Sequence, residues 1–199
     1  MTAVGTLALQ GDFAAHRKRL AALGASAPEV RWPQQLEELD GLVIPGGEST
    51  TLLHLMDREP GWWPAVEAFH RRGGGIFGTC AGLILLARRV RHPEQRSLGL
   101  LDVDVDRNAY GRQVDSSEGF GRWADGRPLE MVFIRAPRIT RVGDGVDVLA
   151  WHGDDPVLVA QGNLLAASFH PELTTDDSVH RLFLARLATP LADGASSVA

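Results

Sequence analysis

The chain has 199 residues, of which 44% are hydrophobic and 23% charged, and its formal net charge at pH 7 is −5. This length and composition are typical of a globular protein of one domain and exclude an intrinsically disordered one. Because the net charge is negative, the protein has no overall positive electrostatic potential that would attract nucleic acid or anionic lipid. We therefore expect neither a nucleic-acid nor a membrane partner. The single cysteine excludes an intramolecular disulfide framework and a multi-cysteine zinc site.

The apolar N-terminal stretch Val4–Leu9 does not have the form of a signal peptide. No positive region precedes it, and the polar Gln10-Gly11-Asp12 ends it early. No segment approaches the roughly 18 consecutive apolar residues that a membrane span requires. A lone thiol suits a reducing compartment. We therefore expect a soluble protein of the cytoplasm.

The first ninety residues alternate between short apolar runs and segments with helical periodicity. Asp12 is the expected N-cap of the first helix, and Gly24 its end. The patterns predict a strand at 4–9, a helix at 13–23, a strand at 41–44, a helix after 51, a helix at 64–72, a strand at 76–79 and a helix at 81–89. This alternation predicts an α/β fold with a mainly parallel sheet.

The second half has a different pattern, in which short strands separated by turns follow one another. They are predicted at 101–106, 130–134, 146–151, 157–161 and 164–169. We expect antiparallel additions to the same sheet or beside it. A closing helix is predicted at 177–187. No linker divides the chain, so we expect one domain over 1–190 and a disordered tail at 191–199.

The lone Cys80 lies between an apolar strand and a helix, in the sequence Gly78-Thr79-Cys80-Ala81-Gly82. The pattern G-x-C-x-G at such a junction is the nucleophile elbow with sulfur as the nucleophile. Small flanking residues allow the sharp turn, and the start of a helix favours the thiolate. The N–H of Ala81 is a candidate oxyanion donor. A buried structural cysteine is the alternative, since that is the commoner role of a lone cysteine.

A thiol nucleophile needs a base, and His170-Pro171-Glu172 is the best candidate among seven histidines. In an extended chain, residues at i and i+2 project to the same side, so Glu172 could orient the His170 imidazole. Pro171 restricts the residue before it to extended conformations. The alternative is a turn that merely ends a strand.

Several other polar segments are candidates for ligand binding. The Gly46-Gly47 turn after the second strand could present N–H groups to an oxyanion, and a phosphate loop is its weaker alternative because the lysine of that motif is absent. Arg107 and Arg135 each adjoin a strand end, where a guanidinium could bind a carboxylate. The basic cluster 88–92 is interpreted as the cationic C-terminus of a helix, and 152–155 as a polar hairpin turn. We expect no metal ion and no cofactor.

Taken together, these motifs resemble those of the triad-type (class I) glutamine amidotransferases. More closely, the chain is similar to the PdxT family, the glutaminase subunits of pyridoxal 5'-phosphate synthase. The superfamily motifs are G-x-C-x-G at 78–82 and the histidine and glutamate at 170–172. The vitamin B6 branch is indicated by Pro-Gly-Gly-Glu-Ser-Thr at 45–50 and Arg-Asn-x-x-Gly-Arg-Gln at 107–113. With segments 9–12 and 133–137, the matches span about residues 4 to 187.

The resemblance implies a flavodoxin-like three-layer α/β/α sandwich and the hydrolysis of L-glutamine by a catalytic triad. The implied triad is Cys80, His170 and Glu172, with oxyanion donors from Gly47 and Ala81. The implied glutamine contacts are Gly47, Glu48, Ser49, Arg107, Ile134 and Arg135.

The implied partner is the synthase subunit of a heteromeric complex, which uses the released ammonia to make pyridoxal 5'-phosphate. Two alternatives remain open. The chain could be the glutaminase of another ammonia-using synthase, such as the imidazole glycerol phosphate system. It could also be a non-catalytic binding module of the same fold.

Overall fold

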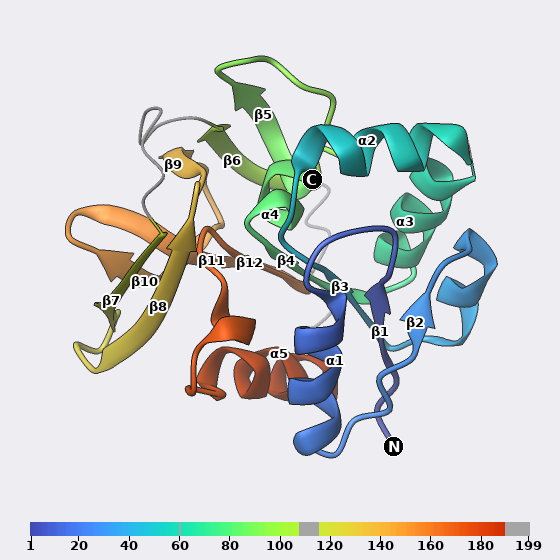
Figure 1. Ribbon diagram of the computed structural model, residues 1–199, viewed down its shortest axis with the longest axis horizontal. Helices are drawn as coiled ribbons and strands as arrows, with labels where there is room; N and C mark the ends of the chain where they lie inside the picture. Colours follow the sequence, from blue (N-terminus) through green and yellow to red (C-terminus); the bar gives the residue numbers. More distant parts are fainter. Residues whose placement is uncertain (60, 108–115, 190–199) are drawn as a thin grey trace, which may run out of the picture.

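A nine-stranded mixed sheet forms the centre of the molecule (Figure 1). The computed structural model describes residues 1–59, 61–107 and 116–189. The strands, in their order across the sheet, are β2 (Glu29–Val30), β1 (Val4–Leu7), β3 (Gly41–Ile44), β4 (Gly75–Thr79), β12 (Leu164–Ala167), β11 (Asp155–Gln161), β10 (Asp147–His152), β7 (Ser116–Trp123) and β8 (Pro128–Ile134).

The two halves of this sheet differ in strand direction. Neighbours from β2 to β12 are parallel, and those from β12 to β8 are antiparallel. A second, three-stranded sheet consists of β5 (Ala87–Arg91), β6 (Leu101–Asp106) and β9 (Arg138–Val142). The prediction of a parallel sheet with antiparallel additions from the C-terminal half is therefore confirmed, and the additions lie both within the main sheet and beside it.

Helices cover both faces of the main sheet, which gives the predicted three-layer α/β/α sandwich. Figure 1 shows α1 (Phe13–Ala22) and α5 (Ser178–Ala188) on one side and α2 (Ser49–Arg58), α3 (Trp62–Arg71) and α4 (Ala81–Leu86) on the other. Two short 3₁₀ helices, η1 (Pro33–Glu38) and η2 (Pro171–Leu173), complete the described elements.

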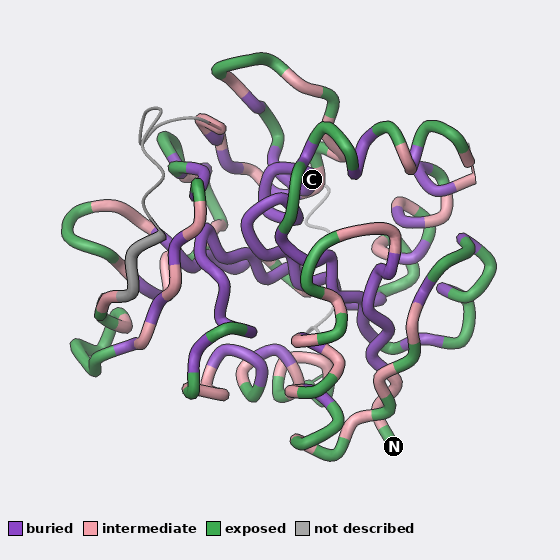
Figure 2. Tube along the Cα trace, in the orientation of Figure 1, coloured by how far each residue is buried: buried purple, intermediate pink, exposed green. Residues whose placement is uncertain are grey.

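Each face of the sheet has its own apolar core. Ile76 of β4 packs in the cluster beneath α2 and α3, whereas its neighbour Phe77 packs with Phe183 of α5 in the other cluster. Successive strand residues point to opposite faces, so a strand buried on both sides must be apolar throughout. The purple central strands in Figure 2 show this double burial. It explains why these strands could be predicted as continuous apolar runs.

The predicted helix at 81–89 is wrong beyond residue 86. Helix α4 ends at Leu86, and the chain continues directly as strand β5. The basic cluster therefore does not lie at a helix C-terminus. The Arg88 guanidinium pairs with the Asp102 carboxylate of β6 at 3.0 Å, and that of Arg91 lies 3.3 Å from the carboxylate of Asp106, which is also on β6. Pairing with β6 thus overrides the helical pattern of the sequence.

The other predicted helices and strands are confirmed with small shifts of their bounds. The polar segment 152–155 is the β10–β11 hairpin turn, in which Gly153 has φ 59°. Strands β2, β5, β7 and β9 were not predicted. The predicted tail at 191–199 and most of the 107–113 motif lie outside the described residues. Within the described part of the chain, no helix is both long enough and apolar enough to cross a membrane.

Candidate active site

The predicted site residues gather where parallel strands of the main sheet end. Each of four neighbouring strands is followed by one part of the site. The segment after Leu7 follows β1, the Gly46-Gly47 turn follows β3, Cys80 follows β4 and His170 follows β12. Open α/β sheets bind ligands at this carboxyl edge, because the strand ends and the following loops converge there. The register supports the convergence, since Thr79 pairs with Ala167 and Gly78 with Ile44.

Cys80 occupies a strained turn between β4 and α4. Its φ of 47° and ψ of −99° lie outside the regions that ordinary residues favour, as expected for an elbow nucleophile. A Cβ at Gly82 would stand 2.2 Å from the carbonyl oxygen of Ile44, and one at Gly78 would stand 2.6 Å from the Gly82 backbone. Both glycines are therefore required for helix α4 to lie this close to the sheet.

His170 and Glu172 form a buried pair, with 2.8 Å between Nδ1 and Oε1. Their contact was predicted from an extended chain, and that reason is wrong. Pro171 begins the 3₁₀ turn η2, and this turn brings the Glu172 carboxylate back to the imidazole. The backbone N–H of His170 also donates to the Val132 carbonyl at 2.8 Å, which fixes the residue against β8.

The electrostatics of the pair favour its charged form. Burial lowers the pKa of His170, but hydrogen bonds with Cys80 and Glu172, and the charges of both, raise it to about 10. Burial raises the pKa of Glu172, but the charge of His16 and hydrogen bonds from His16 and His170 hold it well below its ordinary value. At neutral pH His170 therefore carries a proton that it can donate, and Glu172 is a carboxylate.

The turn after β3 is held by its own polar contacts. Glu48 is the N-cap of α2, and its carboxylate accepts from the N–H groups of Thr50 and Thr51 at 2.9 and 2.6 Å. Burial raises the pKa of Glu48, but the hydrogen bonds from Thr50 and Thr51 together outweigh it and lower the pKa to about 2. Gly47 has φ 149°, and a Cβ there would stand 2.2 Å from the side-chain amide of Gln10. The Gln10 amide oxygen accepts from the Glu48 N–H at 3.1 Å.

A cleft of about 210 Å³ opens beside Cys80 and His170. This space equals that of about seven liquid water molecules, which suits a ligand the size of one amino acid. All six predicted glutamine contacts line it, namely Gly47, Glu48, Ser49, Arg107, Ile134 and Arg135. Ala81 and Glu172 are buried and do not line the cleft. Asp12 and Ile84 also line the cleft and were not predicted to do so.

The two arginines of the cleft are held differently. Arg107 donates to the Thr50 hydroxyl at 3.0 Å and lies 3.7 Å from the Glu48 carboxylate, so it is tied to the start of α2. Arg135 has φ 46°, a conformation that is rare for residues with a side chain. Such strain concentrates at functional sites, where the surrounding structure imposes it.

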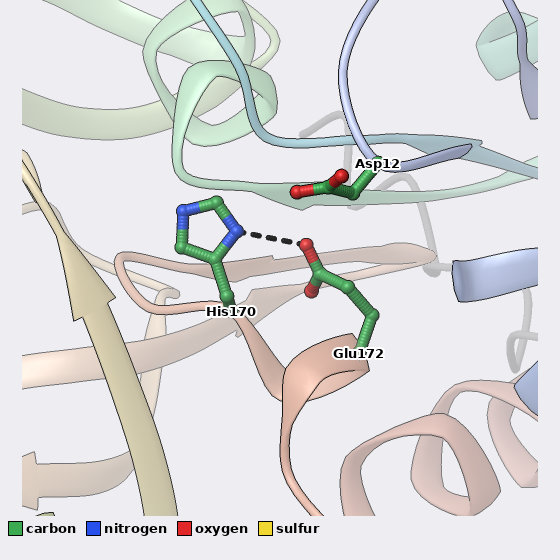
Figure 3. A group of neighbouring side chains, drawn as sticks. All are labelled: Asp12, His170 and Glu172. Carbon is green, nitrogen blue, oxygen red and sulfur yellow. Dashed lines mark hydrogen bonds and ion pairs between the residues drawn. The ribbon is translucent and has the colours of Figure 1, made fainter. Parts of the chain in front are cut away.

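Asp12 is the N-cap residue of α1, as predicted, but its carboxylate makes no capping hydrogen bond. It turns instead toward His170 and Glu172 (Figure 3), and ligand atoms of these three residues lie within 4.8 Å of one another. On distance alone they could hold a metal ion. The His170 nitrogen facing Glu172, however, carries the proton of their hydrogen bond and has no lone pair to offer. We therefore assign no metal to this group.

Sequence reasoning missed the residues behind the pair. His16 of α1 and His180 of α5 are fully buried, and His16 Nε2 lies 3.2 Å from Glu172 Oε2. Thr79, the residue before Cys80, accepts from the Gly46 N–H through its hydroxyl at 3.0 Å. The only available signal was a histidine on the apolar face of a predicted helix, which reads equally well as a core residue.

Comparisons with known proteins identify relatives of this chain. The chain is 53% identical over 182 residues to the pyridoxal 5'-phosphate synthase subunit PdxT of Koribacter versatilis, covering 91% of this chain and 93% of that one. It is 54% identical over 183 residues to the subunit of the same name from Thermus thermophilus, covering 91% and 95%.

Solved structures lead to the same group of proteins. A crystal structure described as a glutamine amidotransferase has 50% identity and a TM-score of 0.86, covering 94% of this chain and 99% of that one. PurLQS from Thermotoga maritima, at 16% identity and a TM-score of 0.71, shares the fold over 94% of this chain and 98% of its own. Residues 6–189 match the SNO glutamine amidotransferase family. The chain therefore belongs to the SNO glutamine amidotransferase family.

Proposed function

We propose that the chain hydrolyses L-glutamine to L-glutamate and ammonia, with Cys80, His170 and Glu172 as its catalytic triad. One observation carries the proposal: Cys80 and His170 line the same cleft, which suits one amino acid, and His170 is hydrogen-bonded to the buried Glu172 at 2.8 Å. Membership in a glutamine amidotransferase family supports it.

In the first step the Cys80 thiolate attacks the side-chain amide carbon, and negative charge develops on the carbonyl oxygen. The N–H of Ala81 has no acceptor within helix α4 because it lies in the first turn, so it can donate to this oxygen together with the N–H of Gly47. His170 gives its proton to the amide nitrogen, the C–N bond breaks, and ammonia leaves. A γ-glutamyl thioester remains on the sulfur.

In the second step neutral His170 takes a proton from a water molecule that attacks the thioester. The C–S bond breaks, glutamate leaves, and the thiolate and imidazolium are restored. Glu172 holds the imidazole in one orientation and stabilises its charge through both steps, as the third member of a triad does.

For binding, the guanidinium groups of Arg107 and Arg135 match the α-carboxylate of glutamine. Glu48 remains charged at neutral pH, because its pKa is about 2, and it offers a counter-charge to the α-ammonium group. Gly47, Ser49 and Ile134 complete the contacts. These groups would select an amino acid and would leave its side-chain amide facing Cys80.

The destination of the ammonia follows from the relatives, which are named as subunits of pyridoxal 5'-phosphate synthase. Ammonia released into water at pH 7 becomes ammonium, which is not a nucleophile, so a partner that consumes it must receive it directly. On this proposal residues 1–190 form one glutaminase domain that docks on a synthase subunit in the cytoplasm.

The test mixes the chain with a synthase subunit, amide-¹⁵N glutamine, a pentose phosphate and a triose phosphate. Glutamate and ¹⁵N-labelled pyridoxal 5'-phosphate should form together, and the Cys80→Ala variant should form neither. Glutamate without labelled pyridoxal phosphate would indicate a glutaminase for another synthase. Absence of glutamate at every partner concentration would indicate a non-catalytic module.

A further inference from the structure

A buried chain of polar side chains continues behind the proposed triad. His16 of α1 and His180 of α5 are both 0% exposed although their side chains are polar. His16 Nδ1 lies 3.0 Å from His180 Nε2, and His16 Nε2 lies 3.2 Å from Glu172 Oε2. The same nitrogen is 3.2 Å from the Thr79 hydroxyl oxygen. The two helices that lie together on one face of the sheet in Figure 1 thus meet through this pair.

The chemistry of Glu172 fixes the direction of these contacts. A carboxylate only accepts hydrogen bonds, and its Oε1 already accepts from His170. Glu172 Oε2 has no aligned hydrogen-bond donor among the described residues, and His16 Nε2 is the nitrogen that faces it, at 3.2 Å. A hydrogen on His16 Nε2 would partner this oxygen, since the carboxylate itself has none to give. Both carboxylate oxygens of Glu172 then face an imidazole, one from the reacting side and one from the core.

Thr79 joins this chain to the oxyanion side of the site. Its hydroxyl oxygen accepts from the Gly46 N–H at 3.0 Å and lies next to His16 Nε2. Cys80 follows directly on Thr79, so a shift of this side chain would be transmitted to the nucleophile and to the Gly46-Gly47 turn. The buried His16 imidazole thus contacts both Glu172, which orients the base His170, and Thr79, which holds the Gly46-Gly47 turn.

We propose that His16, backed by His180, is a positioning residue for glutamine hydrolysis. Its Nε2–H fixes the Glu172 carboxylate, and through Thr79 it fixes the turn that carries the oxyanion donor. This inference rests on the proposed function, since it assigns no reaction of its own. The competing role is structural, because the His16 ring also packs edge-on against Phe77 at 5.9 Å between centroids.

Two isosteric substitutions separate these roles. The amide nitrogen of glutamine reaches the place of the imidazole Nε2, whereas that of asparagine reaches only the place of Nδ1. His16→Gln therefore keeps a donor toward Glu172, and His16→Asn loses it while keeping a polar group of similar burial. A positioning role predicts a kcat near that of the parent for His16→Gln and a loss of about tenfold to a hundredfold for His16→Asn, because misplacing a reacting group by about 1 Å costs on this order.

Leu20→Ala is the matched control for lost stability. Leu20 lies one turn along α1 from His16 and is also 0% exposed, but it belongs to the apolar core. The rate of glutamate release is measured at a series of glutamine concentrations, at a temperature well below the unfolding temperature of every variant. Circular dichroism at that temperature gives the folded fraction. We expect Leu20→Ala to lower the unfolding temperature while kcat and KM per folded molecule stay unchanged, and KM to change little in either His16 variant.

The outcomes distinguish this proposal from the one on which it rests. If Cys80→Ala retains full activity, the proposed covalent mechanism fails. If Cys80→Ala is inactive but His16→Asn keeps the parental kcat per folded molecule, only the positioning role is overturned. Equal impairment of His16→Gln and His16→Asn also overturns it, since a structural role in packing does not depend on the place of the donor.

Discussion

Gly46→Ala places a methyl group between the proposed nucleophile and base. A Cβ at this position would stand 2.3 Å from Cε1 of His170 and 3.2 Å from Cβ of Cys80. Ordinary van der Waals contact begins at 3.4 Å, so the imidazole must retreat by about 1.1 Å. Because Cys80 bounds the methyl on the other side, the strain falls mainly on the imidazole and its 2.8 Å bond to Glu172.

The expected magnitude follows from this displacement. Misplacing a catalytic group by about 1 Å costs on the order of a hundredfold in rate, or about 2.7 kcal/mol of transition-state stabilisation. Crowding a packed interior also costs about 1–3 kcal/mol of folding free energy. We therefore expect kcat/KM for glutamine to fall at least about a hundredfold in a protein that still folds.

Steady-state glutamate formation measures the first effect and thermal unfolding the second. Gly74→Ala is a suitable control, because a Cβ there would stand 2.5 Å from the ring of Phe69, away from the site. It should lower the unfolding temperature comparably and leave kcat/KM within about twofold. If Gly46→Ala keeps kcat/KM within about threefold of the parent while unfolding at the same temperature, the geometry assigned to His170 is incorrect.

Three further predictions concern the nucleophile, the substrate contact and the pH dependence of stability. Cys80→Ala should abolish glutamine hydrolysis while leaving the unfolding temperature nearly unchanged, and residual activity in purified variant protein would contradict a covalent mechanism. Arg107→Ala should raise KM for glutamine about tenfold or more with little change in kcat, because it removes a carboxylate contact made throughout the reaction; an unchanged KM would exclude that contact. Burial and the charge of His16 lower the pKa of His180 to about 3, from 6.5 in the unfolded chain. The unfolded state therefore binds the extra proton as pH falls below 6.5, and stability is lost in that direction by up to about 1.4 kcal/mol per pH unit. In denaturant unfolding, His180→Leu should reduce this dependence between pH 6.5 and 4.5, and parallel curves for the two proteins would contradict it.

The sequence predicted those features of the fold that depend on short segments. Continuous apolar runs located β1, β3 and β4, because a strand buried on both faces has little choice of residue. The course of the chain after Leu86 was not predictable in this way. Ala87–Arg91 follows the apolar helix without an intervening glycine or proline to mark its end, and its strand conformation comes from pairing with β6.

In the site, too, the features carried by short sequence motifs could be predicted, and those that depend on contacts between distant segments could not. The G-x-C-x-G elbow and the His170-Pro171-Glu172 turn are local motifs, so they could be found in the sequence. His16 and His180 are separated by 164 positions, and each alone resembles a histidine on the buried face of a helix. Only the packing of α1 against α5 places them behind Glu172. The role of a buried polar side chain depends on the group that it contacts, and that contact could not be predicted before the fold was known.

Strand register sets the distance between the proposed nucleophile and base. Thr79 pairs with Ala167, and the Cys80 N–H donates to the Ala167 carbonyl at 2.8 Å, so β12 aligns His170 with the elbow. A slip by one residue would displace His170 by about 3.3 Å along the strand and turn its side chain to the other face. A shift of that size would carry His170 and its partner Glu172 away from Cys80 together, because the turn η2 links the two residues locally. The apolar side chains of β12, which must face both cores, oppose such a slip. The contacts that stabilise the sheet therefore also set the geometry on which the proposed chemistry depends.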